Sequence, residues 1–70
     1  MWDYARLKGR IRESGTTQED LGRKIGLTPA TFSLKLNNKA EFKHNEIENI
    51  CIALNIPPAE IPSYFFTHQV

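Results

Sequence analysis

Cysteine, long apolar runs and targeting segments are scarce or missing in this sequence of 70 residues. Its one cysteine, Cys51, excludes an internal disulfide, and no cluster of Cys and His residues has the spacing of a zinc site. No apolar run approaches the roughly 20 residues of a membrane span, and the initial segment MWDYARLKGR lacks the apolar core of a signal peptide. We therefore expect a protein of a reducing, cytosolic setting with no membrane association.

Catalytic signatures are missing as well. The sequence has no glycine-rich phosphate-binding loop and no nucleophile beside an activating base at a recognisable spacing. His44 and His68 lie far apart, without a carboxylate or cysteine pattern that would suggest a metal ligand or a catalytic base. Cys51 stands between two isoleucines, which favours a buried apolar role over a redox switch. These absences argue against an enzyme and predict no cofactor, no metal and no small-molecule ligand.

Basic side chains are absent from the second part of the chain. All nine Lys and Arg residues lie within residues 1–43, together with five acidic residues, so that this part has a net charge of +4. From His44 onward there are three acidic residues and no Lys or Arg, which gives a net charge of −3. Such asymmetry indicates a basic face for a polyanion and a different face for something else, or it serves only solubility.

What the chain does have is apolar residues at helical spacing. They predict helices from Asp3 to Glu13, over about nine residues before Gly26, from Pro29 to Asn37, and after Asn45 as far as Leu54. The predicted caps are Asp3, Thr16-x-x-Glu19 (a better match than Thr17-x-x-Asp20), Thr28 and Asn45-x-x-Glu48. A last segment, Pro58 to Phe66, begins as a helical turn that Pro62 interrupts. The sequence thus predicts one all-α domain over residues 1–70, a compact bundle of four to five short helices.

The second and third predicted helices must meet at a steep corner. Only Leu27 and Thr28 separate Gly26, which allows the left-handed turn that ends a helix, from Pro29 at the first position of the next one. Isolated helices under about 12–15 residues are marginal in water, so both helices depend on packing. We therefore predict a helix-turn-helix over residues 17–37.

At these residues the sequence resembles the Cro/CI-type helix-turn-helix regulators of bacteriophages and bacteria, also called the lambda-repressor-like or XRE family. The residues that support the resemblance are Gln18, Leu21, Ile25, Gly26, Leu27, Phe32 and Asn37. The segments YARLKGRIRE and FSLKLNNKAEF are most similar to small phage-encoded Cro-like or repressor proteins. The sequence departs from the family pattern at Gly22, Lys35 and Asn38, where alanine, an apolar residue and glycine are usual.

The resemblance implies that the helix before Gly26 crosses the DNA backbone and that the next helix enters the major groove. Its DNA-contacting residues would be Thr28, Pro29, Ala30, Ser33 and Leu34 in the groove, and Lys35, Asn37 and Lys39 toward the backbone. Gln18 would touch a phosphate or an adjacent base. No Gln, Asn or Arg lies at the centre of the groove face, so bidentate base contacts are unavailable there. Thymine-methyl contacts, one serine hydroxyl and DNA shape would then provide the specificity.

The aromatic end of the chain has two interpretations. Tyr64, Phe65 and Phe66 could fold back over the first helix near Trp2 and Tyr4, or they could join Ile56 and Pro57 in a dimer contact within residues 56–70. We favour the dimer contact, because small relatives of this kind generally bind two-fold operators as dimers through their C-terminal region.

The sequence supports two functional hypotheses. The first is a sequence-specific double-stranded DNA-binding transcriptional regulator of the bacterial cytoplasm and nucleoid, a phage or prophage repressor or Cro-like protein that binds a two-fold operator as a homodimer and occludes a promoter. The alternative is a helical protein-interaction module or antitoxin-like protein that uses its aromatic C-terminal tail. Steeply salt-dependent binding to one operator would support the first hypothesis, and a stable complex with a co-encoded protein would support the second.

Overall fold

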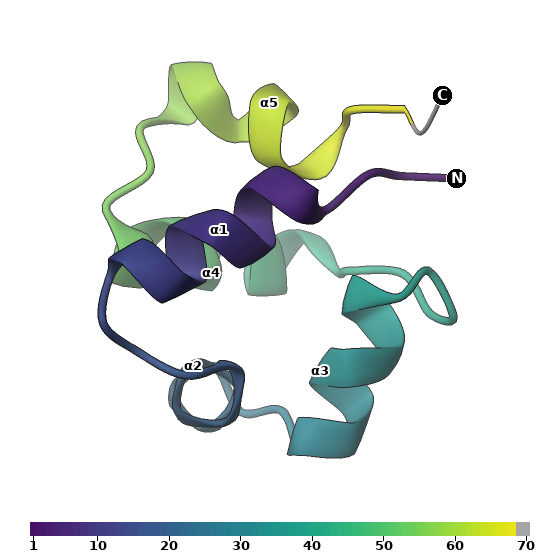
Figure 1. The fold of residues 1–70 in the computed structure, drawn as a ribbon, viewed down its shortest axis with the longest axis vertical. Coiled ribbons are helices and arrows are strands. Elements are labelled where there is room, and N and C mark those ends of the chain that lie inside the picture. Colours follow the sequence, from purple (N-terminus) through teal and green to yellow (C-terminus); the bar gives the residue numbers. More distant parts are fainter. Residues whose placement is uncertain (69–70) are drawn as a thin grey trace.

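The computed structural model describes residues 1–68, which fold into five α-helices and one 3-10 helix without a β-strand. The α-helices are α1 (Ala5–Glu13), α2 (Gln18–Lys24), α3 (Pro29–Leu36), α4 (His44–Leu54) and α5 (Ile61–Phe65), and the 3-10 helix η1 (Pro58–Glu60) directly precedes α5. Helices α2 and α3 lie at one end of the molecule, η1 and α5 lie at the other, and α1 and α4 lie between them (Figure 1). The predicted all-α bundle of short helices is confirmed.

The core contains side chains from all five α-helices. Its largest fully buried members are Leu7, Ile11, Leu21, Phe32, Ile50 and Phe65. Phe42, in the loop between α3 and α4, packs edge-on against the rings of Tyr4 at 5.4 Å, Phe65 at 5.5 Å and Phe32 at 6.1 Å. This one loop residue therefore links α3 to both ends of the chain, and edge-to-face pairs of this kind add to the stability gained by burial alone.

Helices α2 and α3 form the steep corner that the sequence predicts. In Figure 1, α2 is seen along its axis while α3 runs across the view. Gly26 adopts φ +82°, in the left-handed region that glycine enters without steric cost. Thr28 accepts a hydrogen bond from the backbone N–H of Thr31 at 3.2 Å, and Pro29 occupies the first helical position, as predicted.

The preferred cap of α2 was predicted one residue too early. The N-cap is Thr17, whose hydroxyl accepts the backbone N–H of Asp20 at 3.0 Å. The favoured Thr16-x-x-Glu19 match is therefore wrong, because the chain is still extended at Thr17 and enters the helix at Gln18.

The start of α4 and the path of α5 also differ from the predictions. Helix α4 begins at His44, and the carboxylate of Glu46 accepts the backbone N–H of Lys43 at 2.9 Å, so the predicted Asn45-x-x-Glu48 cap is wrong. Pro62 does not interrupt the last helix, because it lies in the first turn of α5, where its missing N–H would have no partner within the helix.

Within residues 1–68, no helix is both long enough and apolar enough to cross a membrane.

Candidate functional site

The outer face of α3 gathers the residues that the family resemblance assigns to the DNA major groove. Its exposed side chains are Thr28, Pro29, Ala30, Ser33 and Leu34. The opposite face buries Phe32 and Leu36 in the core, which fixes the rotation of the helix. Leu34 keeps 48% of its surface exposed and is the largest apolar side chain of this face. The structure therefore brings these five positions together on one surface, and their contact with DNA stays a prediction.

Three residues predicted to approach the DNA backbone are also exposed. Gln18 is the first residue of α2, and Lys39 follows the end of α3. Asn37 directs its amide back to its own helix, donating to the carbonyl oxygen of Ser33 at 2.8 Å. Gln18 and Lys39 are therefore free to meet a partner, whereas Asn37 would have to break a local bond.

Lys35 does not lie where the sequence analysis placed it. Its side chain is only 7% exposed and forms an ion pair and hydrogen bond with Glu46 of α4, itself 8% exposed. The prediction that Lys35 faces the DNA backbone is wrong, because the position is a core-facing one and the ammonium group is neutralised inside the protein. The usual apolar residue at this position is thus replaced by a buried charge pair between α3 and α4.

The charge of Glu46 is favoured by these surroundings. Burial by itself raises the pKa of the carboxyl group. The hydrogen bonds from Lys35 and from the backbone of Lys43, together with the charges of both lysines, outweigh that effect and hold the pKa below its ordinary value. Glu46 is therefore a carboxylate at neutral pH, and it meets Lys35 as one half of a true ion pair.

The α2–α3 corner offers few free positive charges. Arg23 lies 3.1 Å from a carboxylate oxygen of Glu19 and 3.3 Å from one of Asp20. All three side chains belong to α2 and are exposed. Within residues 1–68, Lys24 and Lys39 are the cations of this region that form no ion pair. The corner is consequently close to electrically neutral, which is unusual for a surface that must bind a polyanion.

Most of the residues predicted for a dimer contact are buried inside the chain. Phe65 is 1% exposed, Ile56 6% and Tyr64 8%, so none of these three can pack against a second copy. The tail instead folds back on α1, where the guanidinium of Arg6 lies over the ring of Tyr64 at 4.9 Å. The dimer assignment of Ile56, Tyr64 and Phe65 is therefore wrong, and self-packing, the less favoured interpretation, is what the structure shows. Pro57 and Phe66 remain exposed.

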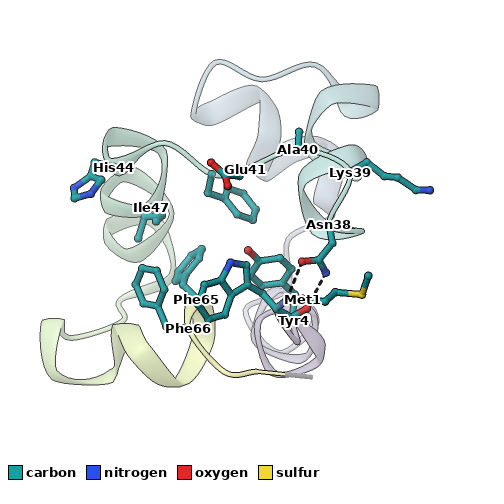
Figure 2. Close-up of a pocket in the computed structure, with 12 residues that line it drawn as sticks. Met1, Tyr4, Asn38, Lys39, Ala40, Glu41, His44, Ile47, Phe65 and Phe66 are labelled. Carbon is teal, nitrogen blue, oxygen red and sulfur yellow. Dashed lines mark hydrogen bonds between the residues drawn. The ribbon is translucent and has the colours of Figure 1, made fainter. Parts of the chain in front are cut away.

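The N-terminal segment is fastened to both α3 and the tail. The side chain of Asn38 accepts the backbone N–H of Trp2 at 2.9 Å and donates to the carbonyl oxygen of Trp2 at 2.7 Å, the two dashed bonds of Figure 2. The Trp2 ring meets Phe66 edge-on at 5.5 Å and lies 4.6 Å from the ring of His68. We call this set of contacts the N-terminal clasp. It lines a pocket into which Tyr4, Phe65 and Phe66 project (Figure 2).

A second hollow lies between α4 and the η1–α5 segment. Its apolar lining comes from Ile47, Cys51, Ile52, Pro58, Ile61 and Phe66, and its polar rim includes His44, Glu48 and Asn55. The volume is about 820 Å³, and the hollow is partly open to solvent. We call it the α4–α5 groove.

Chemically reactive groups are not assembled in either hollow. Within residues 1–68, no three His, Cys, Asp or Glu side chains are grouped so that they could hold a metal ion. Cys51 is buried, and burial raises the pKa of its thiol, which disfavours the nucleophilic thiolate.

Neither the buried Lys35–Glu46 pair nor the α4–α5 groove was predicted from the sequence. A lysine next to Leu36 was interpreted as a surface residue, because a single sequence does not show the acidic partner eleven positions later. The groove had a visible signal: Ile52 lies off the face formed by Ile50, Cys51 and Leu54, and an isoleucine outside the apolar stripe of a helix marks an exposed apolar surface.

Comparisons with known proteins agree with this fold. The solution structure of the modulator of repression (MOR) of the temperate bacteriophage TP901-1 from Lactococcus lactis is similar, with a TM-score of 0.79 and 40% sequence identity over 99% of this chain and 93% of that chain. No curated protein sequence matches. The finer assignment to Cro/CI-type regulators stays a prediction. Residues 1–68 match the family described as "Protein of unknown function (DUF739)", and the chain therefore belongs to that family.

Proposed function

We propose that this protein is a phage or prophage regulator that modulates repression by binding another protein, the repressor. The phage TP901-1 protein that it resembles at 40% identity is named a modulator of repression. A protein that modulates repression must change what a repressor does, and direct binding is the shortest physical route. This is the protein-interaction hypothesis of the sequence analysis, except that Tyr64 and Phe65 of the aromatic tail are buried and only Phe66 stays exposed for binding. The relative is a regulator, and the proposal includes no catalytic step.

The observation that favours a protein partner over DNA is the charge of the α2–α3 corner. Proteins that bind DNA neutralise phosphates with Lys and Arg, and this term dominates their affinity. Here Arg23 is paired with Glu19 and Asp20, and Lys35 is buried against Glu46. The face of α3 is apolar at its centre and offers no side chain for bidentate base contacts. These features favour a protein surface as partner.

Direct DNA binding is the second candidate, because one specific observation favours it. The α2–α3 corner has both N-caps in place and exposes Thr28, Pro29, Ala30, Ser33 and Leu34 on one side of α3. Under this proposal, apolar contacts to thymine methyl groups and the Ser33 hydroxyl would read the DNA sequence, with Gln18, Asn37 and Lys39 near phosphates. The neutral corner predicts weak binding with a shallow dependence on salt.

The test compares the two partners in one buffer series. The purified chain is titrated by isothermal calorimetry into the repressor encoded by the same phage, and by fluorescence anisotropy into the DNA between the two genes. We expect saturable binding to the repressor and no preference for that DNA over a random duplex. Specific DNA binding that Leu34→Asp abolishes, with no heat of binding to the repressor, would overturn the proposal in favour of the second candidate.

A further inference from the structure

The α4–α5 groove lies on the part of the molecule that the α2–α3 corner does not occupy. Helix α4 forms one wall, and η1 and α5, at the far end of the long axis from α2 and α3, form the other (Figure 1). Its volume of about 820 Å³ falls in the range of natural binding clefts, roughly 300–1,000 Å³. Because the groove is open rather than enclosed, it suits an elongated element of a macromolecule better than a small molecule.

The groove gathers exposed apolar surface. Ile52 is 68% exposed and Phe66 is 48% exposed, and both belong to its lining. Half-buried Ile47 and Ile61 continue this surface down to the core. Leaving large apolar side chains in water costs free energy, so a contiguous set of them on an 8.0 kDa protein marks a place that a partner covers.

The groove is lined by one carboxylate and by no Lys or Arg. The carboxylate is that of Glu48, whereas Glu60 of the adjoining η1 does not line the groove and is paired with Arg6 at 3.9 Å. No Lys or Arg lines the groove, because the chain has none after Lys43. An apolar floor with an acidic rim is complementary to an amphipathic helix whose polar edges present Lys or Arg.

We propose that the α4–α5 groove is the docking site for a basic amphipathic helix of the repressor. Apolar side chains of that helix cover Ile52 and Phe66, and a Lys or Arg at its edge meets Glu48. The inference rests on the proposed function, to which it adds the surface and the chemistry of the partner element. Helix-in-groove binding of this type is stabilised mainly by a few apolar anchors at i, i+3 or i+4 and i+7.

A second copy of this chain fits the groove poorly. Two-fold pairing through the groove would set the same acidic rim against itself, and like charges across an interface oppose association. The basic helix that a second copy could offer is α1, but its apolar residues Leu7 and Ile11 are fully buried in its own core. The partner must therefore supply a helix that this chain does not have available.

The test uses two groove variants, each with a neighbour on α4 as control. Ile52→Asp removes the apolar anchor, and Ala53→Asp puts the same charge on the next residue, which is exposed and outside the groove lining. Glu48→Lys reverses the rim charge, and Asn49→Lys adds a positive charge at the adjacent exposed position. Circular dichroism first establishes that all four fold, and isothermal calorimetry then measures affinity for the repressor encoded by the same phage.

We expect Ile52→Asp and Glu48→Lys to weaken repressor binding by at least about tenfold, as hot-spot changes do, with both controls within about twofold of wild type. If all four variants bind as wild type does, the groove is not the docking site, although the proposed function stands. If Leu34→Asp abolishes binding and the groove variants do not, docking is on α3 and this inference is wrong. Absence of binding by the wild-type chain overturns both proposals.

Discussion

At the scale of single residues, the least expected feature is the ion pair of Lys35 and Glu46 in the interior. Taking two charges out of water is costly, and their attraction offsets that cost only when hydrogen bonds satisfy them. Glu46 meets this condition twice, since its carboxylate accepts from the Lys35 ammonium and from the backbone N–H of Lys43. The pair thus joins α3 to α4 and replaces the side-chain cap that α4 otherwise lacks.

Removing one member of the pair should cost more than removing both charges. Lys35→Met leaves a buried carboxylate without its cation and should destabilise the protein by about 3–5 kcal/mol. Adding Glu46→Gln removes the stranded charge and keeps an oxygen that can accept from Lys43, so the double variant should regain most of the loss. Urea unfolding of the wild type, both single variants and the double variant measures this cycle. A loss below about 1 kcal/mol for Lys35→Met would show that Lys35 is not desolvated.

The same pair predicts an acid-sensitive stability. The pKa of Glu46 is lower in the folded protein than its ordinary value of 4.5, because the bonds from Lys35 and Lys43 outweigh the effect of burial. A lowered folded pKa contributes stability above the unfolded pKa, and this contribution is lost as the pH falls from about 4.5 toward the folded pKa. The stability advantage of wild type over Glu46→Gln should therefore shrink as the pH is lowered from 6 toward about 3. If this stability advantage did not change with pH, it would not come from the ionised carboxylate of Glu46.

Two glycines should respond to alanine with opposite signs. A Cβ on Gly22 of α2 would lie 3.0 Å from Cδ2 of buried Phe32 and 3.3 Å from the carbonyl oxygen of Leu27, so in Gly22→Ala these tightly packed neighbours must shift by a few tenths of an ångström. A Cβ on Gly9 of α1 would meet nothing closer than an Arg12 nitrogen at 3.9 Å. We expect Gly22→Ala to lower the stability by about 1–2 kcal/mol and Gly9→Ala to raise it by about 0.5–1 kcal/mol. Thermal unfolding measures both, and stabilisation by Gly22→Ala would mean that Phe32 repacks freely.

At the scale of elements, the N-terminal clasp can be opened without touching a helix. Asn38 adopts φ +61°, which glycine tolerates, so Asn38→Gly keeps the turn after α3 and deletes both hydrogen bonds to Trp2. We expect the Trp2 fluorescence maximum to shift to the red at urea concentrations below the global transition, because the first residues detach alone. Trp2 is the one tryptophan of the chain, which makes the signal specific.

The matched control for the clasp is Asn55→Gly at the end of α4. Asn55 has φ +55° as well, but its side chain forms no hydrogen bond within residues 1–68, so the change removes no comparable contact. Its Trp2 fluorescence should follow the global unfolding curve. If Asn38→Gly behaves in the same way, the clasp is not an independently opening unit.

The helices themselves were largely predictable from local sequence, because local chemistry sets where they start and stop. Gly26, Thr28 and Pro29 fixed the α2–α3 corner through backbone preferences that need no partner. What failed depended on contacts distant in sequence. The position of Lys35 was decided by Glu46, and the start of α4 by the same carboxylate bonding to Lys43.

The candidate site was less predictable than the fold. The exposed residues of α3 could be placed from helical periodicity, because one buried stripe determines what remains outside. The position of the aromatic tail could not be predicted in this way. Its apolar residues would have the same spacing in the sequence whether they covered the protein's own core or contacted a partner. Phe65 turned inward, and its neighbour Phe66 came to line the groove.

At the scale of the whole molecule, two different surfaces lie on different elements: the α2–α3 corner at one end of the long axis, and the groove between central α4 and the η1–α5 segment at the other end (Figure 1). The α2–α3 corner is nearly neutral, and the α4–α5 groove is apolar with an acidic rim. The basic first part and the acidic second part of the sequence thus form only partly separate charged surfaces, because Arg23 and Lys35 form ion pairs with Glu19 and Glu46 of the same chain. A substitution in one of these surfaces should therefore leave the other unchanged.

This arrangement predicts a monomer in solution. Three of the five residues proposed for a dimer, Ile56, Tyr64 and Phe65, are already buried within one chain. The apolar surface that remains, around Ile52 and Phe66, is edged by Glu48, and two copies facing each other there would bring like charges together. Sedimentation velocity at micromolar concentrations should therefore give a mass near 8.0 kDa that does not change when salt is varied. A dimer that forms only at high salt and disappears in Ile52→Asp would show that the groove pairs with itself once its acidic rim is screened.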